Sequence, residues 1–120
     1  MHAYKELIVW QKSMQLAKLV YELTNRFPSH ELYGLCSQIR RCSVSVPSNI
    51  AEGSGRQSKK EFQQFLSVAL GSATELETQL LLAKSLSYVD ETAAQSILGL
   101  VDEVQKMLYR LVKKFREENN

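Results

Sequence analysis

The chain has 120 residues, of which 44% are hydrophobic and 23% charged, and a formal net charge of +2. These values fit a single domain over residues 1–120, and no apolar run approaches the ~20 residues that a membrane-spanning helix needs. With five glycines and two prolines, the composition favours long helices and argues against a sheet protein, which needs frequent turns.

The amino-terminal residues 1–6 lack the basic and then apolar pattern of a signal peptide, so we expect a cytoplasmic protein. The two cysteines, Cys36 and Cys42, are six residues apart and therefore about 120° apart around a helix, which prevents a disulfide within that helix. In an intracellular protein both would stay reduced. His2 and His30 are the only histidines, and their separation predicts no metal site.

The first predicted helix covers residues 7–27 and ends at Pro28, whose ring prevents a further helical turn. Apolar residues recur within it at steps of three and four, in two neighbouring stripes that together form a wide apolar face. One stripe contains Leu7, Trp10, Met14, Ala17 and Tyr21, and the other contains Val9, Leu16, Val20, Leu23 and Phe27.

Ser29 is the predicted cap of the second helix, with Glu31 in the first turn, where the helix dipole favours a carboxylate. Pro47 lies within this helix, where it removes one backbone hydrogen bond and should bend the helix. Gly53 and Gly55 are expected to end it, because glycine readily adopts the left-handed conformation of a carboxyl-terminal cap. The predicted core seam, at heptad spacing, is Leu32, Leu35, Ile39, Cys42, Val46, Asn49 and Gly53.

Ser58 opens the third predicted helix, and Glu61 follows three residues later, at the spacing of a capping box. Around residues 80–83 this helix is apolar on all sides, which predicts a second contact surface there. Asp90 is the predicted cap of the fourth helix. The apolar seam of the third helix is Phe62, Leu66, Ala69, Ala73, Leu76, Leu80 and Ala83, and the apolar face of the fourth is Ile97, Leu100, Val104, Met107, Leu111 and Phe115.

Four helices of this kind, joined by short links, predict an all-α fold: an antiparallel up-down-up-down four-helix bundle. The breaks are expected near Pro28, at residues 53–57 and at residues 87–90. The periodicity of three and four between these breaks leaves no segment with the alternation of a strand.

Several segments also resemble those of a known family. They are L-I-V-W-Q-K-S in the first helix, F-P-S-H-E-L-Y-G-L-C-S-Q-I-R-R, S-V-P-S-N-I-A-E-G-S-G-R, and A-L-G-S-A-T-E-L-E-T-Q-L-L-L-A. The chain resembles the four-helix-bundle proteins encoded in intervening sequences of bacterial large-subunit ribosomal RNA genes, a group that includes accessory proteins of diversity-generating retroelements. The resemblance implies a homopentamer and, for the retroelement members, nucleic-acid binding and a reverse-transcriptase partner.

Charge is unevenly distributed along the chain. Residues 38–60 hold five cations and one carboxylate, whereas residues 61–103 hold one cation and seven carboxylates. A solvated surface of mixed charge explains this pattern as well as a binding face does. In a ring of subunits, repetition of the basic segment would create a strong field for phosphates. The predicted contacts to RNA or DNA are Arg40, Arg41, Arg56, Lys59 and Lys60; no aromatic residue is interleaved among them, so base stacking is not expected.

The sequence predicts neither catalysis nor a cofactor. No histidine follows a glutamate at the Glu-x-x-His spacing of di-metal bundles, and neither cysteine has a histidine nearby to act as a base. The Gly-Ser-Gly at residues 53–55 lacks the Gly-Lys-Ser/Thr ending of a phosphate-binding loop.

Asn49 and Glu52 are predicted to form a structural polar network that fixes helix register or caps the bend at Pro47, in preference to a ligand site. Two functions remain open. The first is an oligomeric nucleic-acid-binding accessory protein, and the second is a scaffold or assembly module whose partner is a protein. Binding to phosphates weakens steeply with salt, whereas apolar docking does not, so salt dependence separates the two functions.

Overall fold

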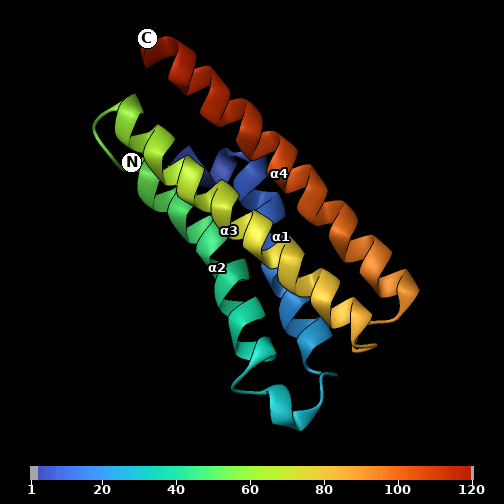
Figure 1. The fold of residues 1–120 in the computed structure, drawn as a ribbon. Helices are drawn as coiled ribbons and strands as arrows, with labels where there is room; N and C mark the ends of the chain where they lie inside the picture. The colour runs from blue at the N-terminus through green and yellow to red at the C-terminus, as the bar shows by residue number, and fades with distance from the viewer. Residues whose placement is uncertain (1–2, 120) are drawn as a thin grey trace.

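The computed structural model describes residues 3–119, which form helices joined by short links and contain no strand (Figure 1). Four α-helices make up the fold: α1 (Ile8–Thr24), α2 (Leu35–Ser54), α3 (Lys59–Ser85) and α4 (Glu91–Asn119). Two short 3-10 turns, η1 (Ala3–Glu6) and η2 (Ser29–Glu31), precede α1 and α2. The predicted all-α class is confirmed, and no helix among the described residues is long and apolar enough to cross a membrane.

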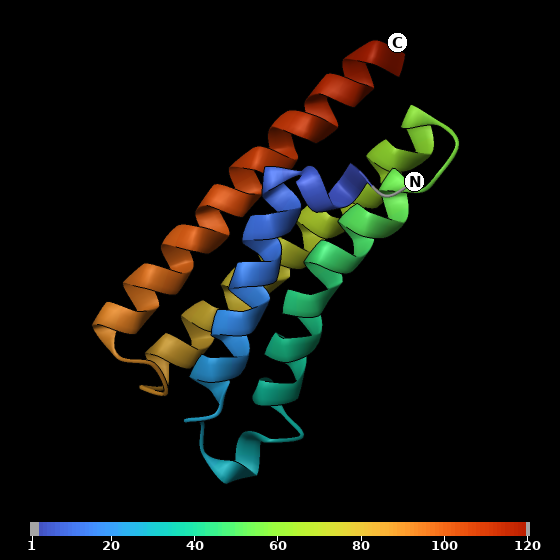
Figure 2. The ribbon, with the colours of Figure 1, turned by 180° about the vertical axis from the view of Figure 1, so that it is seen from behind.

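Successive helices run in opposite directions. Helix α2 packs against α1 and α3, and α4 packs against α3 and α1, so each helix contacts its two neighbours around the bundle. Figures 1 and 2 show both chain ends beside the α2–α3 loop, with the other two links at the opposite end. This is the predicted up-down-up-down four-helix bundle, and it is 46 Å long.

A single apolar cluster between the helices forms the core. The predicted seam of α3 is confirmed from Leu66 to Ala83, with Phe62 partly buried at its start. On α4 two residues of the predicted face, Ile97 and Val104, are buried, and the other four are only partly buried. The full buried line of α4 consists of Ala94, Ile97, Val101, Val104, Leu108 and Val112.

One of the two predicted stripes of α1 is buried in the core, whereas the other only borders it, with Leu7 and Trp10 partly buried. The buried line of α1 includes two hydroxyl residues, Ser13 and Thr24, which the apolar pattern did not mark. Their hydroxyls donate to backbone carbonyls one turn earlier, those of Trp10 and Val20, each at 2.8 Å, and this satisfies them inside the bundle. The other stripe is partly exposed, as at Met14.

The start of α2 differs from the prediction. The helix begins at Leu35 rather than after Ser29, because residues 29–31 form a separate 3-10 turn. Gly34 is the N-cap residue of α2, and Glu31 satisfies the first helical N–H from outside the helix: its Oε1 accepts a hydrogen bond from the Leu35 N–H at 3.1 Å. Leu32 consequently lies outside the helix, and it is exposed rather than part of the core seam.

The end of α2 also differs from the prediction. Gly53 lies inside the helix, and Gly55 caps it with a φ of −86°, an ordinary right-handed conformation. The helix continues through Pro47 to Ser54. The predicted caps of the next two helices are present, since Ser58 Oγ accepts from the Glu61 N–H at 3.1 Å and Asp90 accepts from the Ala93 N–H at 2.8 Å.

Candidate functional site

The five predicted phosphate contacts lie in two separate places on the molecule. Arg40 and Arg41 are in the first half of α2, whereas Arg56, Lys59 and Lys60 lie at or just beyond its end. A helix rises ~1.5 Å per residue, so Arg41 and Arg56 are roughly 22 Å apart along the axis. Within one chain these residues therefore form two basic regions rather than one patch.

Arg40 is held in place at the first region. Its Nε donates to Thr24 Oγ1 at 2.8 Å and its Nη2 to Asn25 Oδ1 at 3.0 Å, both at the end of α1. The guanidinium also lies over the Tyr21 ring, 4.8 Å from the centroid, at a distance typical of a cation–π contact. These three contacts fix the position of one positive charge at the junction of α1 and α2.

A groove of about 810 Å³ surrounds this charge and contains a second arginine. Arg41 is exposed, and its one side-chain hydrogen bond among the described residues is to Ser37 Oγ at 3.3 Å. Tyr33 is 94% exposed in the same groove. No carboxylate lines the groove; its residues are Tyr21, Leu32, Tyr33, Ser37, Arg40, Arg41, Val44 and Ser45.

Two aromatic side chains thus lie beside the arginines, against the expectation that none does. The sequence pattern missed them because Tyr21 and Tyr33 stand outside the basic segment. The packing of α1 on α2, with the intervening link folded back, brings them to Arg40 and Arg41. The nearest signal in the sequence is Tyr33 itself, which lies outside every predicted apolar stripe.

The second basic region is partly neutralised by carboxylates. Arg56 Nη2 pairs with Glu52 Oε2 at 2.7 Å, and Lys59 Nζ pairs with Glu118 Oε1 at 2.9 Å. The hydrogen bond from Lys59 and the nearby positive charge lower the pKa of Glu118 below its usual range. Lys60 is exposed and has no ion pair within residues 3–119.

The structure places Asn49 and Glu52 in different environments. Asn49 Nδ2 donates to the backbone oxygen of Ser45 at 2.8 Å and to its Oγ at 3.0 Å. Ser45 Oγ in turn shares a 2.8 Å hydrogen bond with Ser72 Oγ, which links α2 to α3. Glu52 is exposed and pairs with Arg56, so the polar link between the helices runs through Asn49, Ser45 and Ser72.

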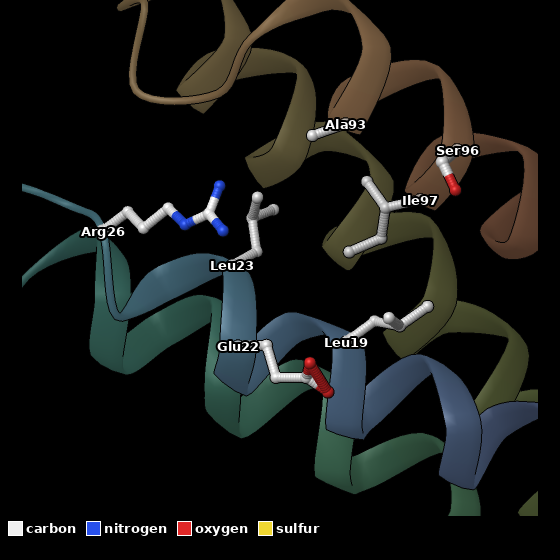
Figure 3. Close-up of a pocket in the computed structure, with 7 residues that line it drawn as sticks. All are labelled: Leu19, Glu22, Leu23, Arg26, Ala93, Ser96 and Ile97. Atoms are coloured by element: carbon white, nitrogen blue, oxygen red, sulfur yellow. The ribbon is translucent and has the colours of Figure 1, made fainter.

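A smaller pocket of about 190 Å³ separates α1 from α4. Figure 3 shows Leu19 and Leu23 of α1 facing Ile97 of α4 across it, with the charged residues at its edge. The pocket is lined by Leu19, Glu22, Leu23, Arg26, Ala93, Ser96 and Ile97. With one carboxylate and no histidine or cysteine in this lining, the pocket offers no pair of groups for acid–base chemistry.

The cysteines and histidines form no reactive cluster among the described residues. Cys36 and Cys42 are buried free thiols, and burial together with the nearby Glu75 raises the pKa of the Cys42 thiol. His30 is exposed, and His2 lies outside the described residues. Within residues 3–119 no group of three or more His, Cys, Asp or Glu side chains is placed to hold a metal ion.

The fold and its surface define a small four-helix-bundle protein with one basic region on α2 and a second where α2 joins α3. Residues 5–110 match the 23S rRNA-intervening sequence protein family, and the chain belongs to that family. The resemblance found in the helical segments is thereby confirmed.

A solved structure supports the same assignment. The crystal structure of a protein with unknown function from the S23 ribosomal protein family of Bacteroides thetaiotaomicron has a similar fold, with a TM-score of 0.82 and 28% sequence identity. The similarity covers 88% of this chain and 96% of the other. A comparison with curated proteins found no match.

Proposed function

We propose that this protein is a homo-oligomeric, non-catalytic protein of the cytoplasm that binds nucleic acid electrostatically through a basic surface. The observation that carries the proposal is the groove beside Arg40 and Arg41, which has two arginines, two tyrosines and no carboxylate in its lining. The family name refers to intervening sequences of 23S rRNA, and the similar structure is assigned to a ribosomal protein family, so both names associate these bundles with RNA.

The two arginines of the groove have different parts in the proposed binding. Arg40 is fixed by Thr24, Asn25 and Tyr21, so it presents a charge at a defined position without losing side-chain freedom on binding. Arg41 is exposed, and the single long hydrogen bond that it makes among the described residues, to Ser37, can be exchanged for a phosphate contact. A guanidinium can donate two parallel hydrogen bonds to phosphate oxygens, which favours arginine over lysine for this contact.

Assembly would raise the strength of this binding. One chain has few unpaired cations on α2, and its two basic regions are roughly 22 Å apart. A ring of identical subunits repeats both regions, and each contact after the first then forms at a high effective concentration. The resemblance implies five subunits, and a reverse transcriptase is the protein partner that it suggests.

Exposed apolar side chains at the end of α3 support the proposed assembly. Leu81 and Leu82 are 48% and 49% exposed, and Leu86 follows them in the same state. Burying such side chains against another chain stabilises the assembly by about 25 cal/mol per Å² of apolar surface. Leu81 and Leu82 lie in the segment, residues 80–83, that the sequence marked as apolar on all sides, and Leu86 lies just beyond it.

The proposal is tested with the variant Arg41→Gln. Fluorescence anisotropy with labelled RNA should show weaker binding for this variant, and a smaller dependence of affinity on salt, because one phosphate contact is lost. Lys18→Gln is the matched control: Lys18 is exposed on α1, outside the groove, and its replacement changes the net charge equally. Equal weakening by both variants, or none by Arg41→Gln, would count against this groove.

A protein scaffold is the second candidate function, and a different surface favours it. A groove of about 330 Å³ along α1 and α2 is mostly apolar and includes several small residues, which allow another helix to approach closely. It is lined by Tyr4, Trp10, Met14, Ala17, Val44, Pro47, Ser48 and Ala51. Wild-type protein that fails to bind RNA or DNA even at low salt would make this second function the leading one.

A further inference from the structure

A third groove, of about 560 Å³, lies between α3 and α4, outside the segment that the sequence marked as basic. Leu70 and Thr74 contribute from α3, and α4 contributes Gln105, Lys106, Tyr109, Arg110 and Lys113. On α4 the positions 106, 109, 110 and 113 are three, four and seven residues apart. This spacing places three cations and a tyrosine on one face of the helix.

Two of these cations are unpaired. Lys106 Nζ pairs with Asp102 at 2.9 Å, whereas Arg110 and Lys113 have neither an ion pair nor a side-chain hydrogen bond within residues 3–119. No carboxylate lines the groove. Glu77 of α3 accepts a hydrogen bond at 3.3 Å from Gln105, one of the lining residues. The groove therefore keeps more free positive charge than the region of Arg56 and Lys59.

Helix stability does not account for these cations. Lys106 and Arg110 are like charges at positions i and i+4, an arrangement that destabilises a helix. The helix dipole favours cations within the last turn, but α4 continues to Asn119, more than two turns beyond Arg110. Exposed cations are ordinary on the solvent-facing side of a helix, and a ligand of opposite charge would relieve the repulsion between them.

Tyr109 provides the second feature of the groove. Its side chain is 59% exposed, and within the described residues it has no ring contact and no hydrogen bond. An aromatic ring that is accessible to solvent and lies beside unpaired cations offers a flat surface for a nucleic-acid base, with phosphate contacts at its side.

We propose that Tyr109, Arg110 and Lys113 bind single-stranded nucleic acid, with a base stacked on Tyr109 and the neighbouring phosphates on the two cations. The inference rests on the proposed function and deepens it, because it specifies the strandedness of the ligand. In a duplex the faces of the bases are already covered by their neighbours, so the ring has no partner there. An acidic protein segment would use the charges but would not need the exposed ring.

The test uses the full chain and two labelled probes, an oligouridine of about 12 nucleotides and an RNA duplex of the same length. Tyr109→Ala should weaken oligouridine binding about tenfold and leave duplex binding unchanged, whereas Tyr109→Phe should bind like wild type. Arg110→Gln with Lys113→Gln should reduce the slope of log affinity against log salt by about 1.4, for two lost contacts to a single strand.

A charge-matched control lies on the same helix. Lys114→Gln with Arg116→Gln removes two exposed cations outside the groove, and it should change oligouridine affinity much less than the groove variants do. Circular dichroism of each variant checks the fold, which these exposed positions should not disturb. Equal losses in the control and groove pairs would contradict a local site.

The outcomes separate this inference from the proposed function. Groove variants that bind oligouridine like wild type, while Arg41→Gln weakens binding, would overturn the α4 site and leave the α2 site standing. The reverse result would support the α4 site and reject the α2 groove as the main contact. Wild-type protein that binds neither probe at low salt would overturn both proposals, and the protein scaffold would then be the leading function.

Discussion

Gly53 of α2 lies directly against Phe65 of α3. A Cβ atom added at position 53 would be 2.6 Å from the Phe65 Cβ and 2.9 Å from Phe62 Cδ1, closer than real Cβ atoms approach one another. The glycine therefore sets how closely α2 and α3 pack beside the loop that joins them. It does so as an interior residue of the helix, not as its cap.

Gly53→Ala should destabilise the protein by about 1–3 kcal/mol, because the extra methyl group forces the backbones of α2 and α3 apart. The measurement is urea-induced unfolding followed by circular dichroism. Gly71 and Gly99 are the matched controls, since a Cβ at either would meet nothing within 4 Å. Alanine there should stabilise the helix by about 0.5–1 kcal/mol, and a neutral or stabilising effect of Gly53→Ala would contradict the packing account.

Glu31 makes the stability of the α1–α2 link dependent on pH. Its carboxylate accepts from the Leu35 N–H and from the Tyr88 hydroxyl, the latter at 2.9 Å, and both bonds lower the pKa of Glu31. A lowered folded-state pKa means that the stabilisation is complete above the unfolded pKa of about 4.3 and is lost as the pH falls through the folded pKa.

Glu31→Gln should therefore lower the urea midpoint at pH 7 and reduce the difference between pH 7 and pH 3. The physical reason is that glutamine cannot supply the charge that strengthens both hydrogen bonds. Tyr88→Phe removes one of the two bonds and should have a smaller effect in the same direction. Glu31→Gln with an unchanged pH dependence would show that other carboxylates control stability in this range.

Ser87, in the α3–α4 link, is the one non-glycine residue among residues 3–119 with a positive φ, 64°. A residue with a Cβ is strained in this left-handed conformation, and glycine is not. Ser87→Gly should raise the free energy of unfolding by about 0.5–1 kcal/mol, measured by thermal and urea unfolding. Ser85→Gly, inside the last turn of α3, should have the opposite sign, and equal signs would contradict the assignment.

Leu82 tests the proposed oligomer. Leu82→Glu places a charge among the exposed leucines at the end of α3, so the mass measured by light scattering should fall while the helical circular dichroism is retained. Thr78→Glu adds the same charge at an exposed polar position of α3 and should leave the mass unchanged. A wild type with the mass of a monomer at micromolar concentration would contradict the assembly itself.

The periodic parts of the sequence predict the bundle well. The α3 seam from Leu66 to Ala83 is correct at every position because a buried helix face repeats every three or four residues. The caps at Ser58 and Asp90 are also correct, since each depends on a contact three residues away. Local chemistry of this kind is visible in the sequence.

Contacts between distant residues were not predictable in the same way. Glu31, whose carboxylate accepts from the first N–H of α2, is fixed in part by Tyr88, which is 57 residues away. Lys59 pairs with Glu118, which is 59 residues away, so the sequence could not show that its charge is partly neutralised. The Arg56–Glu52 pair, in contrast, is visible in the sequence at spacing i, i+4. The candidate grooves depend on such tertiary contacts, so composition located the basic segment but not the surfaces it forms.

The central claim is that this bundle binds nucleic acid through phosphate contacts. The most direct measurement is an anisotropy titration of the wild-type chain against labelled single-stranded RNA at about 50 mM and 200 mM salt. The claim predicts binding at the lower salt and an affinity roughly 300-fold weaker at the higher salt, for about six phosphate contacts to a single strand in the assembly. No binding at the lower salt, or an affinity independent of salt, would contradict it.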